Sequence, residues 1–160
     1  MSIGPKASSA VAEDSSARLS LDPLKYRELT EKILSIFYDV YNELGHGFLE
    51  QVYARSMEHA LTTAGLRVAR EVPIVVWFRG VQVGDFKADL LVEDKVLLEL
   101  KAARSIDAAF EKQTLNYLRA TEIEIGLLLN FGNKPEFRRF AFENSRKRIR
   151  VHPRSSAVEK

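Results

Sequence analysis

Glu99, Leu100 and Lys101 form the local pattern most able to do chemistry, because a carboxylate and an ammonium alternate there within an otherwise apolar stretch. In an extended strand, side chains two residues apart project to the same face, so Glu99 and Lys101 would point the same way. A buried carboxylate needs a metal, a cation or hydrogen bonds to stay ionised. This pattern therefore indicates either a metal site or an acid neutralised by a neighbouring lysine.

Asp89 is a second acid in an apolar stretch and lies shortly before Glu99 in the chain. If residues 93–95 all belong to the turn between the two strands, or if a bulge intervenes, Asp89 lies beside Glu99 on the same face. A strict two-residue turn would place the two side chains on opposite faces. The sequence leaves these registers open, and it also allows a structural acid pair neutralised by Lys101 or Lys87.

Two converging carboxylates beside a lysine suit metal-assisted hydrolysis of a phosphodiester. Mg²⁺ or Mn²⁺ binds oxygen ligands, polarises a phosphate and lowers the pKa of a bound water, while an ammonium stabilises developing negative charge. The chain has no cysteine, which excludes thiolate zinc sites and cysteine nucleophiles. His59 and His152 have no partners at metal-ligand spacing, and His46 lies between two glycines, where a surface role is the commoner one.

Two further pairs could support such a site from helices. Glu50 and Tyr53 are one turn apart at the start of an expected helix, and the apolar neighbours of Glu50 indicate that it points inward or nearly so. Gln113 and Tyr117 share a face of a later helix. Each pair also has an ordinary explanation, namely an acid favoured at a helix start and an interfacial tyrosine beside a polar neighbour.

The elements that must position these residues follow from apolar periodicity. Spacings of three and four predict helices, and β-branched or apolar runs bounded by turns predict strands. Asp107 is expected to cap the third helix. The expected helices cover residues 29–44, 49–64 and 108–121, and the expected strands cover residues 71–78, 81–92, 96–101, 125–131 and 137–142. A helix between strands of one sheet implies a crossover, so we predict an α/β fold with a mixed central sheet, a three-stranded meander and flanking helices.

Composition sets limits on the class of protein. The 160 residues carry a formal charge of +2, with 46% hydrophobic and 29% charged residues, as in ordinary globular chains. The longest apolar run, residues 74–78, is far shorter than the roughly 20 residues that span a bilayer, and no signal peptide is recognisable. We therefore expect a cytoplasmic protein with no membrane partner. Its expected organisation is a disordered tail over residues 1–22, a domain over 23–142 and a basic tail over 143–160.

Basic residues are concentrated near the end of the chain. Such a patch can bind phosphate backbones, although a solvated basic tail is the simpler interpretation. The candidate nucleic-acid-binding residues are Arg138, Arg139, Arg146, Lys147, Arg148 and Arg150.

The candidate residues fall into five segments whose order resembles that of the GxxExxY protein family of the PD-(D/E)xK nuclease-like superfamily. These segments are Gly47-x-x-Glu50-x-x-Tyr53, residues 86–92, Glu99-Leu100-Lys101-Ala102, Gln113-x-x-x-Tyr117-Leu118 and residues 126–132. Ala88 precedes Asp89 where the superfamily name has proline, and Phe110 stands where relatives often carry histidine. The resemblance covers residues 29–139 and implies a restriction-endonuclease-like core.

The resemblance also implies roles for individual residues. Asp89 and Glu99 would bind Mg²⁺ or Mn²⁺, with Glu50 as an additional acid and Lys101 as the catalytic lysine. The supporting residues of the crossover helix would be Gln113 and Tyr117. The resulting prediction is a metal-dependent nuclease that acts on nucleic acid, with DNA as the favoured substrate. The alternative is a nucleic-acid-binding or protein-interaction module that keeps the fold without catalysis, and the oligomeric state is left open.

Overall fold

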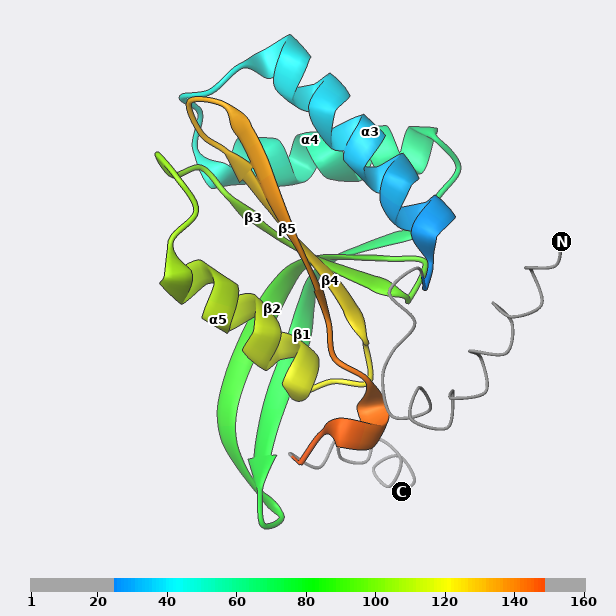
Figure 1. Cartoon of the computed structure of the whole chain (residues 1–160), viewed down its shortest axis with the longest axis vertical. Helices are drawn as coiled ribbons and strands as arrows, with labels where there is room; N and C mark the ends of the chain where they lie inside the picture. Colours follow the sequence, from blue (N-terminus) through cyan, green and yellow to red (C-terminus); the bar gives the residue numbers. More distant parts are fainter. Residues whose placement is uncertain (1–24, 149–160) are drawn as a thin grey trace, which may run out of the picture.

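The computed structural model describes residues 25–148 (Figure 1). Two helices come first, followed by three strands, a third helix and two more strands, in the predicted order. A short 3₁₀ helix, which was not predicted, follows. The elements are α3 (Arg27–Leu44), α4 (Glu50–Thr63), β1 (Val68–Phe78), β2 (Val81–Val92), β3 (Val96–Lys101), α5 (Ala108–Arg119), β4 (Ile125–Phe131), β5 (Pro135–Ala141) and η1 (Asn144–Arg146). The predicted tail over residues 1–22 lies outside the described residues.

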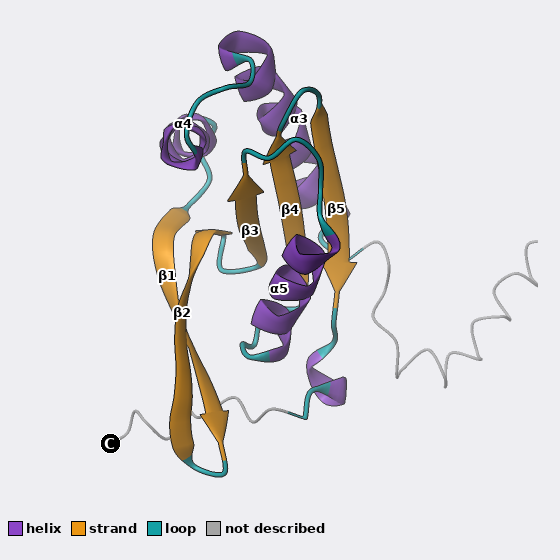
Figure 2. Ribbon diagram, turned by 90° about the vertical axis from the view of Figure 1, so that its left-hand side faces the viewer, coloured by secondary structure: helices purple, strands orange, loops and turns teal. Residues whose placement is uncertain are grey.

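The five strands form one mixed sheet in the order β1-β2-β3-β4-β5. Neighbouring strands are antiparallel except β3 and β4, which are parallel because α5 carries the chain back across the sheet. Helices α3 and α4 cover one face of the sheet and α5 covers the other (Figure 2). The predicted α/β fold with its meander and crossover helix is confirmed.

The face beneath α3 and α4 holds the larger part of the core. Phe37 from α3 and Tyr53 from α4 both contact Phe131 at the end of β4, with ring centroids 4.9 Å and 4.2 Å away respectively. All three side chains are buried, and each large apolar side chain taken from water stabilises the fold by about 1.5–3 kcal/mol. This aromatic cluster fixes the start of α4 against the sheet.

Helix α5 packs on the opposite face through Tyr117 and Leu118, which contact Ile74, Ala88 and Leu97 of the first three strands. As predicted, the helix is capped by Asp107, whose side chain accepts a hydrogen bond from the backbone N–H of Ala109 at 3.0 Å. The start of α5 is therefore fixed beside the end of β3.

The β1–β2 hairpin bends at the level of Asp89. Leu90 packs under α3 and α4, whereas Ala88 packs under α5, so the strand changes faces within two residues. Glu71 of β1 lies between two residues paired with Ala88 and Leu90, and it has a left-handed φ of 57°. Beyond the bend the hairpin projects from the body as an arm (Figure 2), with Phe78 exposed near its tip.

The turn between β2 and β3 is longer than the strict two-residue turn that the sequence also allowed. Val92 pairs with Val96, so all of residues 93–95 form the turn. Glu93 and Asp94 both adopt left-handed φ values, at 55° and 57°. The register that places Asp89 beside Glu99 is therefore the one that forms.

The chain continues to pack on the body after β5. The Lys147 ammonium donates hydrogen bonds to the backbone carbonyls of Thr121 and Ile123, each at 2.8 Å, and the Asn144 N–H donates to Glu124. Among the described residues, no helix is both long enough and apolar enough to cross a membrane.

Candidate active site

Asp89 and Glu99 meet where β2 and β3 separate. The backbone pairing of these strands ends at Leu90 and Leu98, one residue before the two acids. The Asp89 N–H donates a hydrogen bond to Glu99 Oε2 at 3.1 Å, and the Leu100 N–H donates to Asp89 Oδ2 at 2.7 Å. Each carboxyl group therefore accepts a hydrogen bond from the neighbouring strand, and the two acids are held together at the fork.

Burial perturbs both acids. Glu99 is only 4% exposed, and burial together with the negative charge of Asp89 raises its pKa to about 8. The pKa of Asp89 is also raised, mainly by burial and further by the charge of Glu50. Without a bound metal, Glu99 is therefore mainly protonated at neutral pH, since burial and the adjacent carboxylate both oppose its ionisation.

Lys101 lies on the same face of β3 as Glu99, as the alternation predicts. Its positive charge lowers the pKa of both Asp89 and Glu99, although less than burial raises them. The ammonium forms no ion pair with any described residue and lies over the ring of Phe110, 4.7 Å from the ring centre. The lysine is therefore beside the acids without being paired to either.

Helix α5 brings Gln113 and Tyr117 to the same region. The side-chain amide of Gln113 donates a hydrogen bond to the Tyr117 hydroxyl at 3.2 Å, which confirms that the two share a helix face. Burial raises the pKa of Tyr117, and the charge of nearby Glu99 raises it further. The Gln113 carbonyl oxygen is buried without a hydrogen-bond partner, so this site retains an unused acceptor.

Glu50 is exposed, which corrects the prediction that it points inward. It is the first residue of α4. It instead lines a pocket of about 300 Å³ that it shares with Asp89, Arg70 and Glu71. Glu50 therefore faces Asp89 across open space.

Arg70 and Glu71 were not predicted as site residues. The Arg70 Nε lies 2.9 Å from Glu58 Oε1, and an Nη lies 3.4 Å from a Glu71 oxygen. Arg70 and Glu71 both line the pocket. The only sequence signal was a charged pair inside a strand. Its meaning depended on the β1–β2 register, which places Glu71 opposite Asp89.

Tyr53 explains the spacing of the segment that contains Glu50. Its hydroxyl donates to the Gly45 carbonyl at 2.6 Å and accepts from the Phe48 N–H at 3.2 Å. Because the Tyr53 ring is stacked on Phe131, these bonds fix the loop that leads into Glu50. Tyr53 thus positions the first turn of α4.

Asn130 has the same effect on the segment after Lys101. Its buried side chain accepts from the Ala103 N–H and donates to the Ala103 carbonyl, each at 2.9 Å. Gly132 lies against the same segment so closely that a Cβ there would be 2.2 Å from the Ala103 carbonyl oxygen. The end of β4 therefore anchors the link between β3 and α5.

The predicted nucleic-acid-binding residues do not share one surface. Arg138 contacts Glu111 on the α5 side of the sheet. Arg139 is the next residue of β5, so its side chain projects to the opposite face, where it donates a hydrogen bond to the Lys25 carbonyl. Lys147 is bound to backbone carbonyls, and burial lowers its pKa to about 8. Arg146 stacks on the Phe142 ring, Arg148 is exposed, and Arg150 lies outside the described residues.

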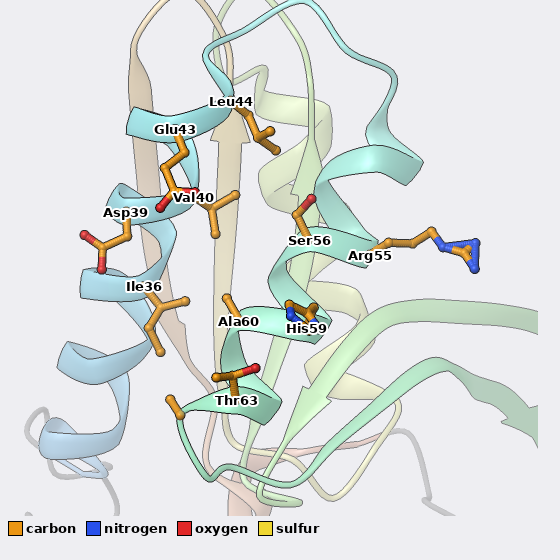
Figure 3. A pocket seen from close by; sticks show the side chains of 11 residues that line it. Ile36, Asp39, Val40, Glu43, Leu44, Arg55, Ser56, His59, Ala60 and Thr63 are labelled. Atoms are coloured by element: carbon orange, nitrogen blue, oxygen red, sulfur yellow. The ribbon is translucent and has the colours of Figure 1, made fainter.

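A larger pocket lies between α3 and α4 (Figure 3), and neither acid of the fork lines it. Asp39 and Glu43 from α3 and Arg55 and His59 from α4 line it, around an apolar floor that includes Val40. No group of three or more His, Asp or Glu side chains within the described residues could hold a metal there. None of the predicted site residues lines this pocket.

The fold and the acid pair define a class of protein that sequence comparison identifies. Residues 27–140 match the family model of the PD-(D/E)XK nuclease superfamily. The chain belongs to that superfamily.

Among solved structures, a crystal structure described as that of SSO0001 matches with a TM-score of 0.49 and 18% sequence identity. The match covers 75% of this chain and 61% of that chain, so this chain spans about three fifths of that protein's length. Among curated proteins, no sequence match was found.

The superfamily implies a divalent metal, and the residues at the fork fit one in part. Asp89 and Glu99 supply only oxygen ligands, which Mg²⁺ and Mn²⁺ prefer, and Mg²⁺ typically takes one or two carboxylates and keeps several waters. Among residues 25–148, no three acids or histidines are close enough together to form a complete cage. A metal bound at the fork would have Asp89 and Glu99 as its protein ligands, and Glu50 lies across the pocket from Asp89.

Proposed function

We propose that this protein is a metal-dependent nuclease that hydrolyses phosphodiester bonds in DNA. The proposal rests chiefly on the fork, where the buried Glu99 and the partly buried Asp89 are held by crossed hydrogen bonds beside an ammonium that forms no ion pair with a described residue. A structural acid pair would be expected to recruit that ammonium as its counter-ion. The chain's membership of a nuclease superfamily makes phosphodiester hydrolysis the reaction that best fits this arrangement.

Each side chain has a distinct role in the proposed reaction. Asp89 and Glu99 would hold Mg²⁺ or Mn²⁺, which supplies an electrophile for the phosphate and a water of lowered pKa. Lys101 would stabilise the negative charge that develops on the phosphate. Gln113 would orient a water or a substrate group through its unused carbonyl oxygen, and its amide would hold Tyr117 in place.

Glu50 and Arg70 would act from the pocket wall. The exposed carboxylate of Glu50 would bind a metal-coordinated water or accept its proton. The free N–H groups of Arg70 would bind a neighbouring phosphate of the strand, since a guanidinium forms paired hydrogen bonds with phosphate oxygens. Both residues line the pocket that contains Asp89, where a strand would have to enter.

The decisive experiment is a cleavage assay of the purified chain. Labelled single-stranded and double-stranded DNA and RNA are each incubated with Mg²⁺, Mn²⁺ or Ca²⁺, or with EDTA, and the products are resolved on a denaturing gel. The proposal predicts cleavage of DNA with Mg²⁺ or Mn²⁺ and none with EDTA. Cleavage of RNA alone would correct the substrate, and cleavage in EDTA would contradict metal dependence.

The Lys101→Met variant separates chemistry from binding. Because the ammonium acts mainly on charge that develops during reaction, we expect the single-turnover rate to fall by about 10² or more, with little change in DNA affinity. The matched control is Lys87→Met, which removes an exposed lysine of β2. The assay is repeated at saturating Mn²⁺, because loss of Lys101 also changes the electrostatics of the two acids. A wild-type rate for Lys101→Met under that condition would exclude a catalytic lysine.

The second candidate function is a nucleic-acid-binding module that keeps the nuclease fold. It is favoured by one observation, namely that no three-ligand metal cage exists within the described residues. If the wild-type protein binds DNA or RNA but cleaves neither with any divalent ion, this second function replaces the first.

A further inference from the structure

The contact between Lys101 and Phe110 has not been assigned a role. The Lys101 Nζ lies 4.7 Å from the centre of the Phe110 ring, which is within the distance over which an aromatic face attracts a cation. Phe110 is in the first turn of α5, and its backbone N–H donates to the Asp107 carbonyl at 2.9 Å. The ring is therefore attached to a capped helix end, which is a rigid support.

The segment that joins these two residues is also fixed. Lys101 ends β3, and Ala103 is held by the buried side chain of Asn130 through two hydrogen bonds. The side chain of Asp107 caps α5 at the other end of the segment. Because both ends are anchored, the distance between the backbones of Lys101 and Phe110 is set by the fold and not by a flexible loop.

An aromatic ring holds an ammonium differently from a carboxylate. A lysine paired with Glu99 or Asp89 would occupy the oxygens that a metal needs, and the metal would have to displace it. A ring attracts the ammonium more weakly and leaves those oxygens free. It also restrains a long side chain whose four-carbon stem would otherwise sample many rotamers.

We propose that Phe110 is a positioning residue for Lys101. Its ring holds the ammonium beside the fork without pairing it to the acids, so that the carboxyl groups stay available to the metal and the ammonium stays available to the phosphate. This inference rests on the proposed nuclease function. It adds a residue that acts on the reaction only through Lys101.

The test changes the ring's electrostatics while keeping its shape. Phenylalanine analogues with one, two and three ring fluorines are incorporated at position 110, since fluorine progressively weakens the attraction of the ring face for a cation. We expect the single-turnover cleavage rate to fall stepwise, by about two- to five-fold in total, as suits one partly exposed cation–π contact. Phe110→Trp should retain the rate, and Phe110→Leu should lower it.

The same fluorinated series in the Lys101→Met background is the control for a structural effect. If Phe110 acts through the ammonium, fluorination has no effect once the ammonium is gone. If Phe110 only supports packing, the same stepwise loss appears in both backgrounds. That second result would overturn the inference.

A spectroscopic measurement tests the contact without relying on activity. The Lys101 ε-methylene protons, assigned by comparison with Lys101→Met, should show an upfield ring-current shift in the wild-type spectrum that Phe110→Leu abolishes. Titration with Mg²⁺ should give weaker binding in Phe110→Leu than in Phe110→Trp, because the released ammonium turns to the acids. An unshifted Lys101 signal in the wild-type protein would overturn the contact itself.

Different results would overturn the proposed nuclease function and the role of Phe110. A wild-type protein that cleaves no nucleic acid overturns the proposed function. An active wild-type protein whose rate does not respond to ring fluorination overturns only the role of Phe110.

Discussion

At the scale of single residues, the acid pair determines how the protein responds to pH. The pKa of Glu99 is raised from an ordinary value of 4.5 to about 8, with burial as the largest cause and Asp89 as the next. In the unfolded chain this carboxyl group ionises near its ordinary pKa, whereas in the folded chain it keeps its proton. The raised pKa of Glu99 therefore lowers the free energy of unfolding progressively as the pH rises from about 4.5 to 8.

The Glu99→Gln variant should remove this cost in the metal-free protein. With EDTA present, we expect its stability to equal that of the wild-type protein below pH 4.5 and to exceed it by about 1.4 kcal/mol for each pH unit between 4.5 and 8. Urea denaturation at several pH values measures the difference, with Glu136→Gln on β5 as the control. A variant that is less stable than the wild type at pH 8 would instead support a structural role for the carboxylate.

Metal binding should release a proton from the same residue. Because a carboxylate must be ionised to bind a cation, Mg²⁺ has to displace the Glu99 proton below pH 8. We expect affinity to rise by about tenfold per pH unit up to that value, and Asp89→Asn and Glu99→Gln each to abolish binding without unfolding the chain. Calorimetry in two buffers of different ionisation enthalpy counts the protons. Unchanged binding in both variants would exclude the proposed metal site.

At the scale of elements, the site depends on where strands stop pairing. The backbone pairing of β2 and β3 ends at Leu90 and Leu98. Beyond this point the two carboxyl groups accept hydrogen bonds from backbone N–H groups that would otherwise be available for pairing between the strands. The bend at Glu71 turns the β1–β2 hairpin away at the same level. A left-handed φ at a non-glycine residue is costly, and such conformations are concentrated at functional sites.

Gly132 illustrates how an element distant in sequence supports the site. A side chain at this position would collide with the backbone of Ala103, so Gly132→Ala should lower stability by about 1–3 kcal/mol and reduce cleavage by displacing the link between Lys101 and α5. Gly126→Ala, on the same strand, is the matched control. Its Cβ would lie 3.4 Å from the nearest side-chain atoms and should cost less. Equal losses in the two variants would contradict this explanation.

At the scale of the whole molecule, charge decides how a nucleic acid would be attracted. The formal charge is only +2. Several basic side chains that were predicted to bind phosphate already form hydrogen bonds within the fold, notably Arg138, Arg139 and Lys147. Long-range attraction would therefore depend on the remaining basic residues, which include Arg148 and Arg150 at the end of the chain.

Removal of residues 149–160 tests this dependence. Counterion release makes phosphate contacts salt-dependent, so the truncated protein should bind DNA more weakly, with a smaller slope of log affinity against log salt. The cleavage rate at saturating DNA should be retained. A full-length variant with Arg148, Arg150 and Arg154 changed to glutamine should behave in the same way. An unchanged affinity and slope in both proteins would exclude a role for this end in binding.

The sequence alone determined the elements and their order. Apolar spacing of three and four residues gives α3, α4 and α5, and the Asp107 cap was identified from residue type and position. The crossover between β3 and β4 follows from a helix between strands, so the mixed sheet was also predictable. These features depend on neighbours in the chain, which is why local patterns suffice. The candidate set of Asp89, Glu99 and Lys101 came from charged residues within apolar strand patterns, together with the resemblance of five segments to a known family.

The tertiary structure decided what those residues contact. The turn length that brings Asp89 to Glu99 has no glycine signal, because Glu93 and Asp94 themselves adopt left-handed backbone conformations. The exposure of Glu50 and the pairing of Lys147 likewise depend on elements that meet only after the chain has folded. The Lys101 ammonium lies over Phe110 because α5 begins beside the end of β3. Periodicity fixes the face on which a side chain lies, but long-range packing determines its partner there.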